Sequence, residues 1–256
     1  MKWWMPPLLA VQFLTRLPVP GLNAVTPETA KAGLAKAVIW FPVVGGLVGA
    51  ITAATLIAAD HLWPPIIAVI LALIVEARLT GAFHEDAVAD FCDGFGGGMT
   101  PQRIHEIMKD SRIGSYGTLG MGLAVALRAA LLLVLPDTLI LAALIASAGF
   151  GRYLAVCLMA IIPPLAQTGG LAKDIGAQVG AGQWLAASLL TLPFMVPLGL
   201  MTPVPLFGAL VISFIFAFWF RRYLMHHLGG VTGDCLGFGV YVGQLLILLA
   251  ACATLP

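Results

Sequence analysis

Residues 65–98 read PIIAVILALIVEARLTGAFHEDAVADFCDGFGGG, an apolar run that ends in acids and glycines. The apolar part is long enough to cross most of a bilayer's hydrocarbon core, which is roughly 30 Å thick, as an α-helix. The polar part places Glu85, Asp86, Asp90 and Asp93 within nine residues. This stretch therefore predicts a transmembrane helix that carries an acidic site toward one membrane surface.

The whole chain has the composition of an integral membrane protein. It is 60% hydrophobic and 10% charged, and its mean hydropathy is +1.00. The apolar runs lack the alternating pattern of barrel strands, so they predict α-helices. We expect seven spans, approximately at residues 37–59, 65–83, 118–135, 138–162, 184–202, 204–220 and 236–255. The predicted fold is an all-α, polytopic helical bundle in a single domain over residues 1–256.

The basic residues predict the orientation. With the amino terminus on side one, seven crossings place ten of the 13 lysines and arginines on side one, three within spans and none on the far side. The ten are Lys2, Arg16, Lys31, Lys36, Arg103, Lys109, Arg112, Lys173, Arg221 and Arg222. By the positive-inside rule, side one is cytoplasmic. We expect a multi-pass protein of the cytoplasmic (inner) membrane, with residues 1–36 cytoplasmic or interfacial and the active-site loops cytoplasmic.

The acids of the quoted stretch have helical spacing. If the second span continues as helix past Phe83, Asp86, Asp90 and Asp93 share one face. Three carboxylates there repel each other near a low-dielectric boundary, so they need a cation, or raised pKa values, to coexist. Mg²⁺ suits such oxygen ligands, and it commonly takes one or two carboxylates with water and substrate phosphate. The alternative is a solvated helix end whose acids keep the loop in water.

A glycine run and a basic loop follow the acids. Glycines 96–98 are expected to end the helix and to let backbone N–H groups approach an anion. The stretch MKDSRIGSYG, residues 108–117, then places Lys109 and Arg112 on either side of Asp110. Carboxylate-held Mg²⁺ beside cations and glycine is typical of phosphoryl transfer, which requires neutralisation of charge on the phosphoryl oxygens.

A second polar stretch, RRYLMHHLGGVTGDCLG, covers residues 221–237. Its glycines predict a flexible turn, and Asp234 is expected to open the last span. An acid at a helix amino terminus can complement the helix dipole, or it can join the metal site. The histidines at 226 and 227 can contact phosphate, act as acid or base, or lie on the surface without a role.

Charged residues inside the spans require separate treatment. Glu76 and Arg78 are two residues apart, so they point to different faces of one helix. Arg128 and Arg152 lie near mid-span, where an unpaired charge is costly, and must face the bundle interior. Two interpretations remain open: a buried Glu–Arg network that fixes helix packing, and a cationic lining for phosphates.

Four blocks, in this order among the apolar spans, carry a family resemblance: QFLTRLPVP at 12–20, HEDAVADFCDGFGGG at 84–98, IMKDSRIGSYG at 107–117 and LGGVTGDCLG at 228–237. Together they resemble the cobalamin synthase family, the adenosylcobinamide-GDP ribazoletransferases. The resemblance implies a Mg²⁺-dependent membrane enzyme of the last steps of cobalamin nucleotide-loop assembly. Such an enzyme joins adenosylcobinamide-GDP to α-ribazole, or its 5′-phosphate, and releases GMP. A nucleic-acid partner is not expected, membrane lipid is, and an oligomer is left open.

The residue patterns and the resemblance together assign candidate roles. The expected metal ligands are Asp86, Asp90 and Asp93. The candidate catalytic residues are Glu85, Lys109, Asp110 and Arg112. The candidate substrate-binding residues are Gly96, Gly97, Ser111, Arg152, Gly229, Gly230 and Asp234. The loops at 94–116, 163–183 and 221–235 are candidates for the walls of the substrate cavity.

Two other functions remain as alternatives. The acidic stretch is similar to that of CDP-alcohol phosphotransferases, but no "AR" follows at the expected place and their later aspartate pair is missing. The second alternative is a divalent cation transporter that has intramembrane Glu76 on its pathway. Transporters often show repeated halves, and no convincing internal repeat is found here.

Overall fold

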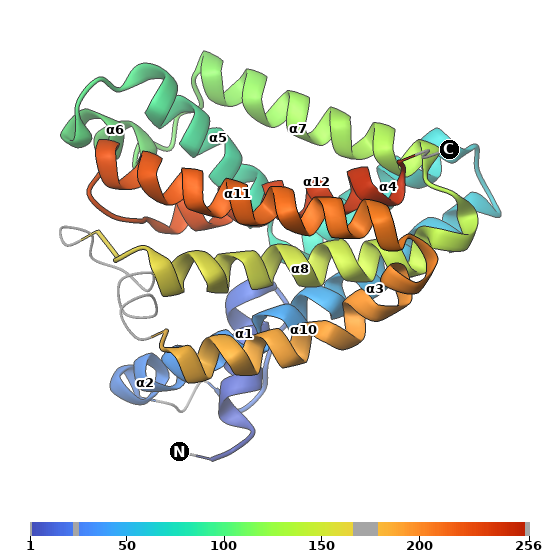
Figure 1. The fold of residues 1–256 in the computed structure, drawn as a ribbon, viewed down its shortest axis with the longest axis horizontal. Coiled ribbons are helices and arrows are strands. Elements are labelled where there is room, and N and C mark those ends of the chain that lie inside the picture. Colours follow the sequence, from blue (N-terminus) through green and yellow to red (C-terminus); the bar gives the residue numbers. More distant parts are fainter. Residues whose placement is uncertain (1, 23–25, 166–178, 254–256) are drawn as a thin grey trace.

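A computed structural model describes residues 2–22, 26–165 and 179–253, and these residues form a helical bundle (Figure 1). Six of the described helices are long and apolar enough to cross a membrane, and α4 and α5 together form a bent pair that can count as a seventh span. The helices are α1 (Met5–Leu14), α2 (Pro27–Ala37), α3 (Phe41–Asp60), α4 (Pro65–Thr80), α5 (Phe83–Gly97), α6 (Pro101–Met108), α7 (Ser115–Val134), α8 (Ile140–Ile161), α10 (Ala181–Met201), α11 (Pro203–His227) and α12 (Gly233–Ala251). The prediction of an all-α, polytopic bundle is confirmed.

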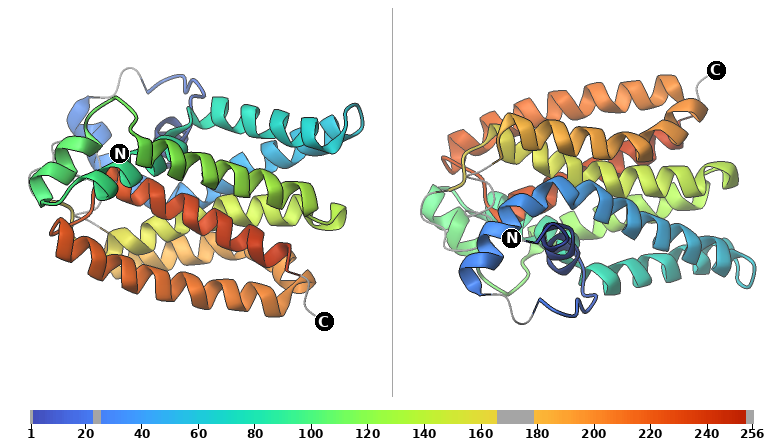
Figure 2. Two further views of the ribbon diagram at one scale, coloured as in Figure 1. Left: turned by 90° about the horizontal axis from the view of Figure 1, so that it is seen from above. Right: turned by 90° about the horizontal axis from the view of Figure 1, so that it is seen from below.

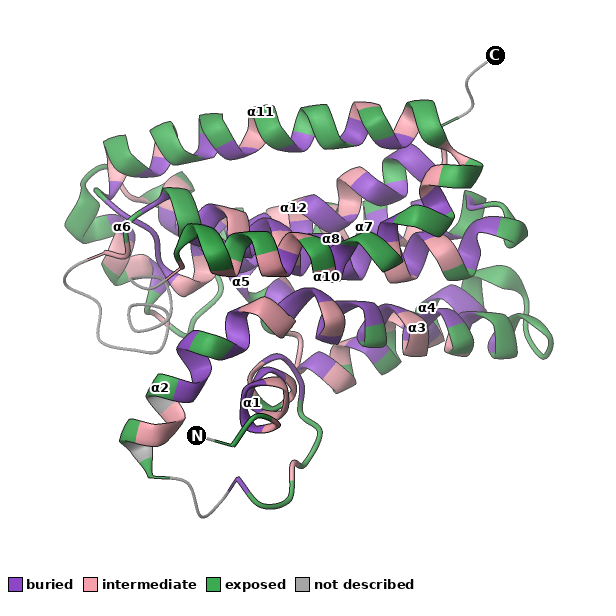
Figure 3. Ribbon diagram, turned by 60° about the horizontal axis from the view of Figure 1, so that its bottom comes forward, coloured by how far each residue is buried: buried purple, intermediate pink, exposed green. Residues whose placement is uncertain are grey.

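The long helices run side by side along one direction (Figure 2). Helices α8 and α12 are buried over most of their length, and α8 packs against α3, α10 and α12. In contrast, α7, α10 and α11 expose large apolar side chains such as Leu123, Leu189 and Phe214 (Figure 3). This outward-facing apolar surface matches a hydrocarbon environment, because lipid tails are as apolar as these side chains.

Glycines allow the two central helices to approach closely. Gly45 and Gly49 of α3 face the backbone carbonyl oxygens of Ala148 and Leu144 in α8, and a Cβ at either glycine would collide with them. Small residues at such contacts are the usual way in which membrane helices gain close van der Waals packing. The α3–α8 pair therefore forms a tightly packed centre against which α4, α10 and α12 lie.

Helix α4 ends at Thr80 and α5 begins at Phe83, so the second span does not continue as one unbroken helix past Phe83. Gly81 and Ala82 have left-handed backbone conformations, with φ of 75° and 55°, and α5 departs at 87° from α4. The N–H groups of both residues donate to the carbonyl of Ala77, which closes the end of α4. The bend gives the acid-bearing helix a direction of its own.

Helix ends explain where the polar segments lie. Helix α11 extends to His227, so the histidines predicted in a loop occupy its last turn instead. The connection from α5 through α6 to α7 and the turn from α11 to α12 lie at the same end of the bundle (Figure 1). Residues 166–178, which include Lys173 and part of the predicted middle loop, lie outside the described residues.

Candidate active site

The acids of α5 form one group with an acid from the end of the chain. Asp86, Asp90 and Asp93 belong to the same helix, at the spacing that places them on one face. Asp234, in the first turn of α12, also lies near enough to repel the carboxylate of Asp90, as do Asp86 and Asp93. These four residues, which we call the acidic cluster, join two blocks that are far apart in the sequence.

The acidic cluster has the donor chemistry of a magnesium site. Among the described residues, no lysine, arginine or histidine side chain lies within 4.0 Å of the carboxylates of Asp86, Asp90 or Asp234. No three metal-binding side chains in this part of the chain converge on one point. Because Mg²⁺ often takes only one or two carboxylates, with water and phosphate as its other ligands, these residues fit an ion held jointly with a substrate.

Asp93 has a second set of partners that the sequence did not predict. Its carboxylate accepts hydrogen bonds from the backbone N–H groups of Gly114, at 2.6 Å, and Gly117, at 2.8 Å. A Cβ at either glycine would collide with the same carboxylate. Asp93 therefore anchors the amino terminus of α7, where a negative charge also complements the helix dipole. In the sequence, the only hint of this contact was the pair of glycines at 114 and 117, just before the apolar span predicted at 118–135.

The basic loop between α6 and α7 contains an exposed ion pair. The guanidinium of Arg112 donates to both carboxylate oxygens of Asp110, with the shortest distance 2.6 Å. These hydrogen bonds lower the pKa of Asp110 to about 2. A carboxylate with so low a pKa is a weak proton acceptor at neutral pH. The arrangement therefore suits Asp110 to orient the guanidinium of Arg112. Lys109 and Ser111 are the neighbours of Asp110 in the chain.

Glu85 faces the bundle interior instead of the acidic face. Its Oε1 lies 3.8 Å from Nη1 of Arg128, and its side chain is 19% exposed. The other oxygen, Oε2, has no hydrogen-bond partner among the described residues. Glu85 therefore lies between the acidic cluster and the charges buried in the spans.

Two of the charges predicted inside the spans, Glu76 and Arg128, form a buried ion pair, which we call the buried ion-pair cluster. Nη2 of Arg128 donates to both oxygens of Glu76, at 2.7 and 2.9 Å, and Thr52 donates to Glu76 at 2.9 Å. Arg128 and Arg152 are almost fully buried, as predicted, whereas Arg78 is exposed. For Glu76 and Arg128, the interpretation as a packing network is the one that the structure supports.

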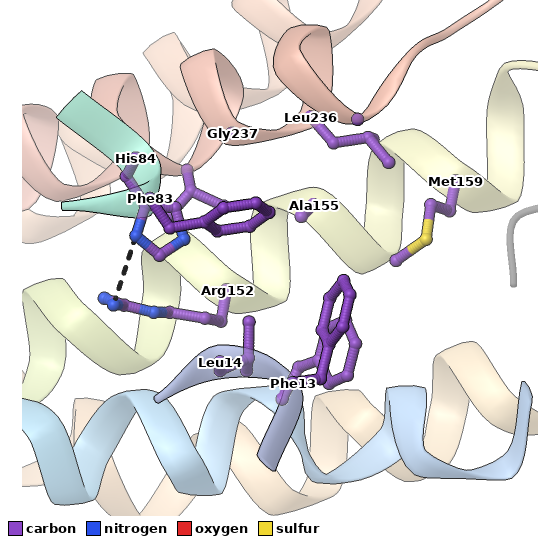
Figure 4. A pocket seen from close by; sticks show the side chains of 12 residues that line it. Phe13, Leu14, Phe83, His84, Arg152, Ala155, Met159, Leu236 and Gly237 are labelled. Carbon is purple, nitrogen blue, oxygen red and sulfur yellow. Dashed lines mark hydrogen bonds between the residues drawn. The ribbon is translucent and has the colours of Figure 1, made fainter. Parts of the chain in front are cut away.

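Arg152 has a different environment from Arg128. It has no carboxylate within 4.0 Å in the described part of the chain, and its Nη2 lies 3.5 Å from Nδ1 of His84. Arg152 and His84 line an apolar cavity together with Phe13 and Phe83 (Figure 4). Arg152 thus lines an apolar cavity whose other lining residues include Gly233 and Gly237, the neighbours of Asp234 in α12.

Two of the predicted substrate-binding glycines, Gly96 and Gly230, have close packing contacts in the structure. A Cβ at Gly96 would meet the ring of Tyr116, and one at Gly230 would meet the backbone of Leu165. Gly229 adopts φ of 74° in the turn that ends α11. Gly97 has room for a Cβ at ordinary contact distance from Ile107. The predicted contacts of these glycines with substrate are untested and remain predictions.

These features define a class of protein: a polytopic helical membrane protein with an acid-rich site and a basic loop at one end of its bundle. The chain belongs to the family described as Cobalamin-5-phosphate synthase, whose model matches residues 6–252. The resemblance given by the four sequence blocks is therefore confirmed.

Curated relatives are named adenosylcobinamide-GDP ribazoletransferase. The protein of Leptothrix cholodnii is 36% identical over 249 residues, covering 90% of this chain and 88% of the relative. That of Ralstonia pickettii is 36% identical, covering 96% and 94%. That of Vibrio cholerae is 36% identical, covering 97% and 93%. No solved structure matches the chain.

Proposed function

We propose that the protein is an adenosylcobinamide-GDP ribazoletransferase that uses Mg²⁺ at the acidic cluster. It joins adenosylcobinamide-GDP to α-ribazole, or to its 5′-phosphate, and releases GMP. The family and the names of its relatives support this transferase chemistry in cobalamin synthesis. The arrangement that carries the site is the gathering of Asp86, Asp93 and Asp234 around Asp90, with no basic side chain of the described residues within 4.0 Å of Asp90.

The reaction is a substitution at the phosphorus linked to cobinamide. The ribazole 3′-hydroxyl attacks, a new P–O bond forms, and the P–O bond to GMP breaks. When bound, Mg²⁺ neutralises charge on the diphosphate. The proton acceptor is an acid that the metal does not hold, and Glu85, which lies between the acidic cluster and the buried ion-pair cluster, is the proposed residue. Lys109 and Arg112, in an exposed loop at the same end, stabilise the charge on departing GMP.

We place the acidic cluster on the cytoplasmic side of the cytoplasmic membrane. The positive-inside rule supports this orientation, because the ten loop lysines and arginines share one predicted side. A single cysteine at position 100 tests it. In intact cells, a membrane-impermeant thiol reagent should not label Thr100→Cys, whereas efficient labelling would contradict the orientation.

The function is tested by reconstitution of the purified full chain with adenosylcobinamide-GDP, α-ribazole 5′-phosphate and Mg²⁺. We expect equal amounts of GMP and the cobalamin 5′-phosphate product. No product from these precursors, together with CMP release from a CDP-linked lipid alcohol, would favour the phosphotransferase alternative. Cation flux into liposomes without nucleotide would favour a transporter.

A further inference from the structure

The outward-facing stripe of α4 ends in a charge. Ile67, Ile70 and Ile74 are exposed by 41 to 51%, and they follow helical spacing along one side of the helix. Arg78 continues the same stripe one turn further on and is also exposed. In a bilayer-spanning helix, this side faces lipid tails over the three isoleucines. Arg78 therefore points toward lipid, away from the buried ion-pair cluster.

A second arginine reaches the same place from the amino-terminal segment. The backbone N–H of Arg16 donates to the carbonyl of Leu79 at 2.7 Å, which fixes the segment after α1 to the end of α4. The side chain of Arg16 lies across Gly81, where a Cβ would collide with its Nε. Arg16 and Arg78 line a single cavity of about 580 Å³ at the α4–α5 bend.

Among the described residues, Arg16 and Arg78 belong to the arginines without a carboxylate partner, as do Arg152, Arg221 and Arg222. Arg103, Arg112 and Arg128 each lie within 4.0 Å of a carboxylate, whereas no described carboxylate is that close to Arg16 or Arg78. Helix α4 has 16 residues and so rises about 24 Å, less than the roughly 30 Å of the hydrocarbon core. An unpaired charge near that boundary is costly unless an anion or water reaches it.

We propose that this cavity binds one anionic phospholipid, with its phosphate between Arg16 and Arg78 and an acyl chain along the isoleucine stripe. Guanidinium groups form charge-assisted, bidentate hydrogen bonds with phosphate oxygens. The apolar stripe leads directly to the two charges, which is the arrangement of a lipid tail and its headgroup. The site is separate from the acidic cluster, so the proposal does not depend on the transferase function.

The test is lipid binding by the full chain purified in neutral detergent. Short-chain phosphatidylglycerol is titrated while the thermal unfolding midpoint is followed, since a ligand that binds the native state raises it. We expect the Arg16→Gln/Arg78→Gln variant to need about tenfold more phosphatidylglycerol, or more, for the same shift. Arg103→Gln, which removes an exposed arginine on α6, is the matched control and should respond as the wild type does.

Phosphatidylcholine and inorganic phosphate are the two comparison ligands. We expect a much smaller shift from either, because the first lacks net charge and the second lacks a tail. An unchanged phosphatidylglycerol response in the double variant would overturn the proposal. An equal response to phosphatidylcholine would mean that only the acyl chain binds, and an equal response to phosphate would mean a soluble-anion site. If the double variant does not fold, Arg16→Gln and Arg78→Gln are tested singly, each with a severalfold weakening expected.

Discussion

The bundle contains two neighbouring groups of charged side chains, and the protein compensates the charge in one group but not in the other. In the buried ion-pair cluster, Arg128 donates to both oxygens of Glu76, so the two charges offset each other within the protein. In the acidic cluster, Asp90 faces three further carboxylates and no nearby basic group among the described residues. Glu85 lies between the two groups, within reach of Arg128.

This difference suggests that one group maintains the structure and the other serves the reaction. Paired charges in a low-dielectric interior fix the relative position of α4 and α7 without any ligand. Like charges without a counter-ion are unfavourable in the protein alone, and either proton uptake or a bound cation offsets them. The proposed function takes the cation. The first group should therefore matter for stability, and the second for catalysis and metal binding.

The largest expected effect is on catalysis. Asp90→Asn removes the carboxylate at the centre of the acidic cluster, and we expect ribazole transfer to fall about a thousandfold or more. The helical content should not change. Asp137→Asn, at an exposed acid on the opposite end of the bundle, is the control and should keep full activity. Full activity in Asp90→Asn would remove the proposed metal site.

The next effect is on stability. Arg128→Met leaves the charge of Glu76 buried and unpaired, which should lower the free energy of unfolding by about 3–5 kcal/mol. The double variant Glu76→Gln/Arg128→Met removes both charges and should recover much of that loss. Unfolding of both proteins in neutral detergent measures the difference. If the double variant is no more stable than the single one, the pair does not act as a unit.

Asp93 belongs to the acidic cluster and also anchors the amino terminus of α7, so its variants separate these two roles. Asp93→Ala removes both acceptors for the amino terminus of α7 and should cost about 1–3 kcal/mol, while Asp93→Asn keeps one acceptor and should cost less. Thermal unfolding gives the order of the two variants. If Asp93 is mainly an anchor, Asp93→Asn should keep more activity at high Mg²⁺ than Asp90→Asn does; the reverse order would make Asp93 the main ligand.

The smallest effect concerns pH. Hydrogen bonds from Arg112 hold the pKa of Asp110 at about 2, below its ordinary value of 3.8. The ion pair therefore stabilises the folded loop fully at pH values above 3.8, and this stabilisation is lost as the pH falls through 2. Between pH 5 and 8 the carboxylate is charged in both states. The difference in unfolding midpoint between wild type and Asp110→Asn should therefore stay small and constant over that range. A steep change near neutral pH would mean that Asp110 titrates there.

Apolar runs of about 20 residues predicted most of the fold, because in lipid each such run must form its own backbone hydrogen bonds. The predicted boundaries of α7, α8 and α10 agree with the observed ones to within a few residues. The bend at Gly81 was missed because a glycine within an apolar run also fits a continuous helix, and the choice depends on tertiary contacts such as that with Arg16.

The site was predictable where it depended on local spacing and less so where it depended on packing. Helical periodicity placed Asp86, Asp90 and Asp93 on one face of α5. The approach of Asp234 was one of two open alternatives, and only the packing of α12 on α5 selects it. The backbone partners of Asp93 could not be derived, since they follow from how α7 meets α5.

The central claim is that the acidic cluster holds a divalent cation against the diphosphate of the substrate. Its most direct test is the rate of GMP release from adenosylcobinamide-GDP and α-ribazole 5′-phosphate as a function of Mg²⁺ concentration, for the wild type and Asp90→Asn. We predict no release after chelation, a saturable rise with Mg²⁺ for the wild type, and little release from the variant at any concentration. Full release by chelated wild-type protein would contradict the account.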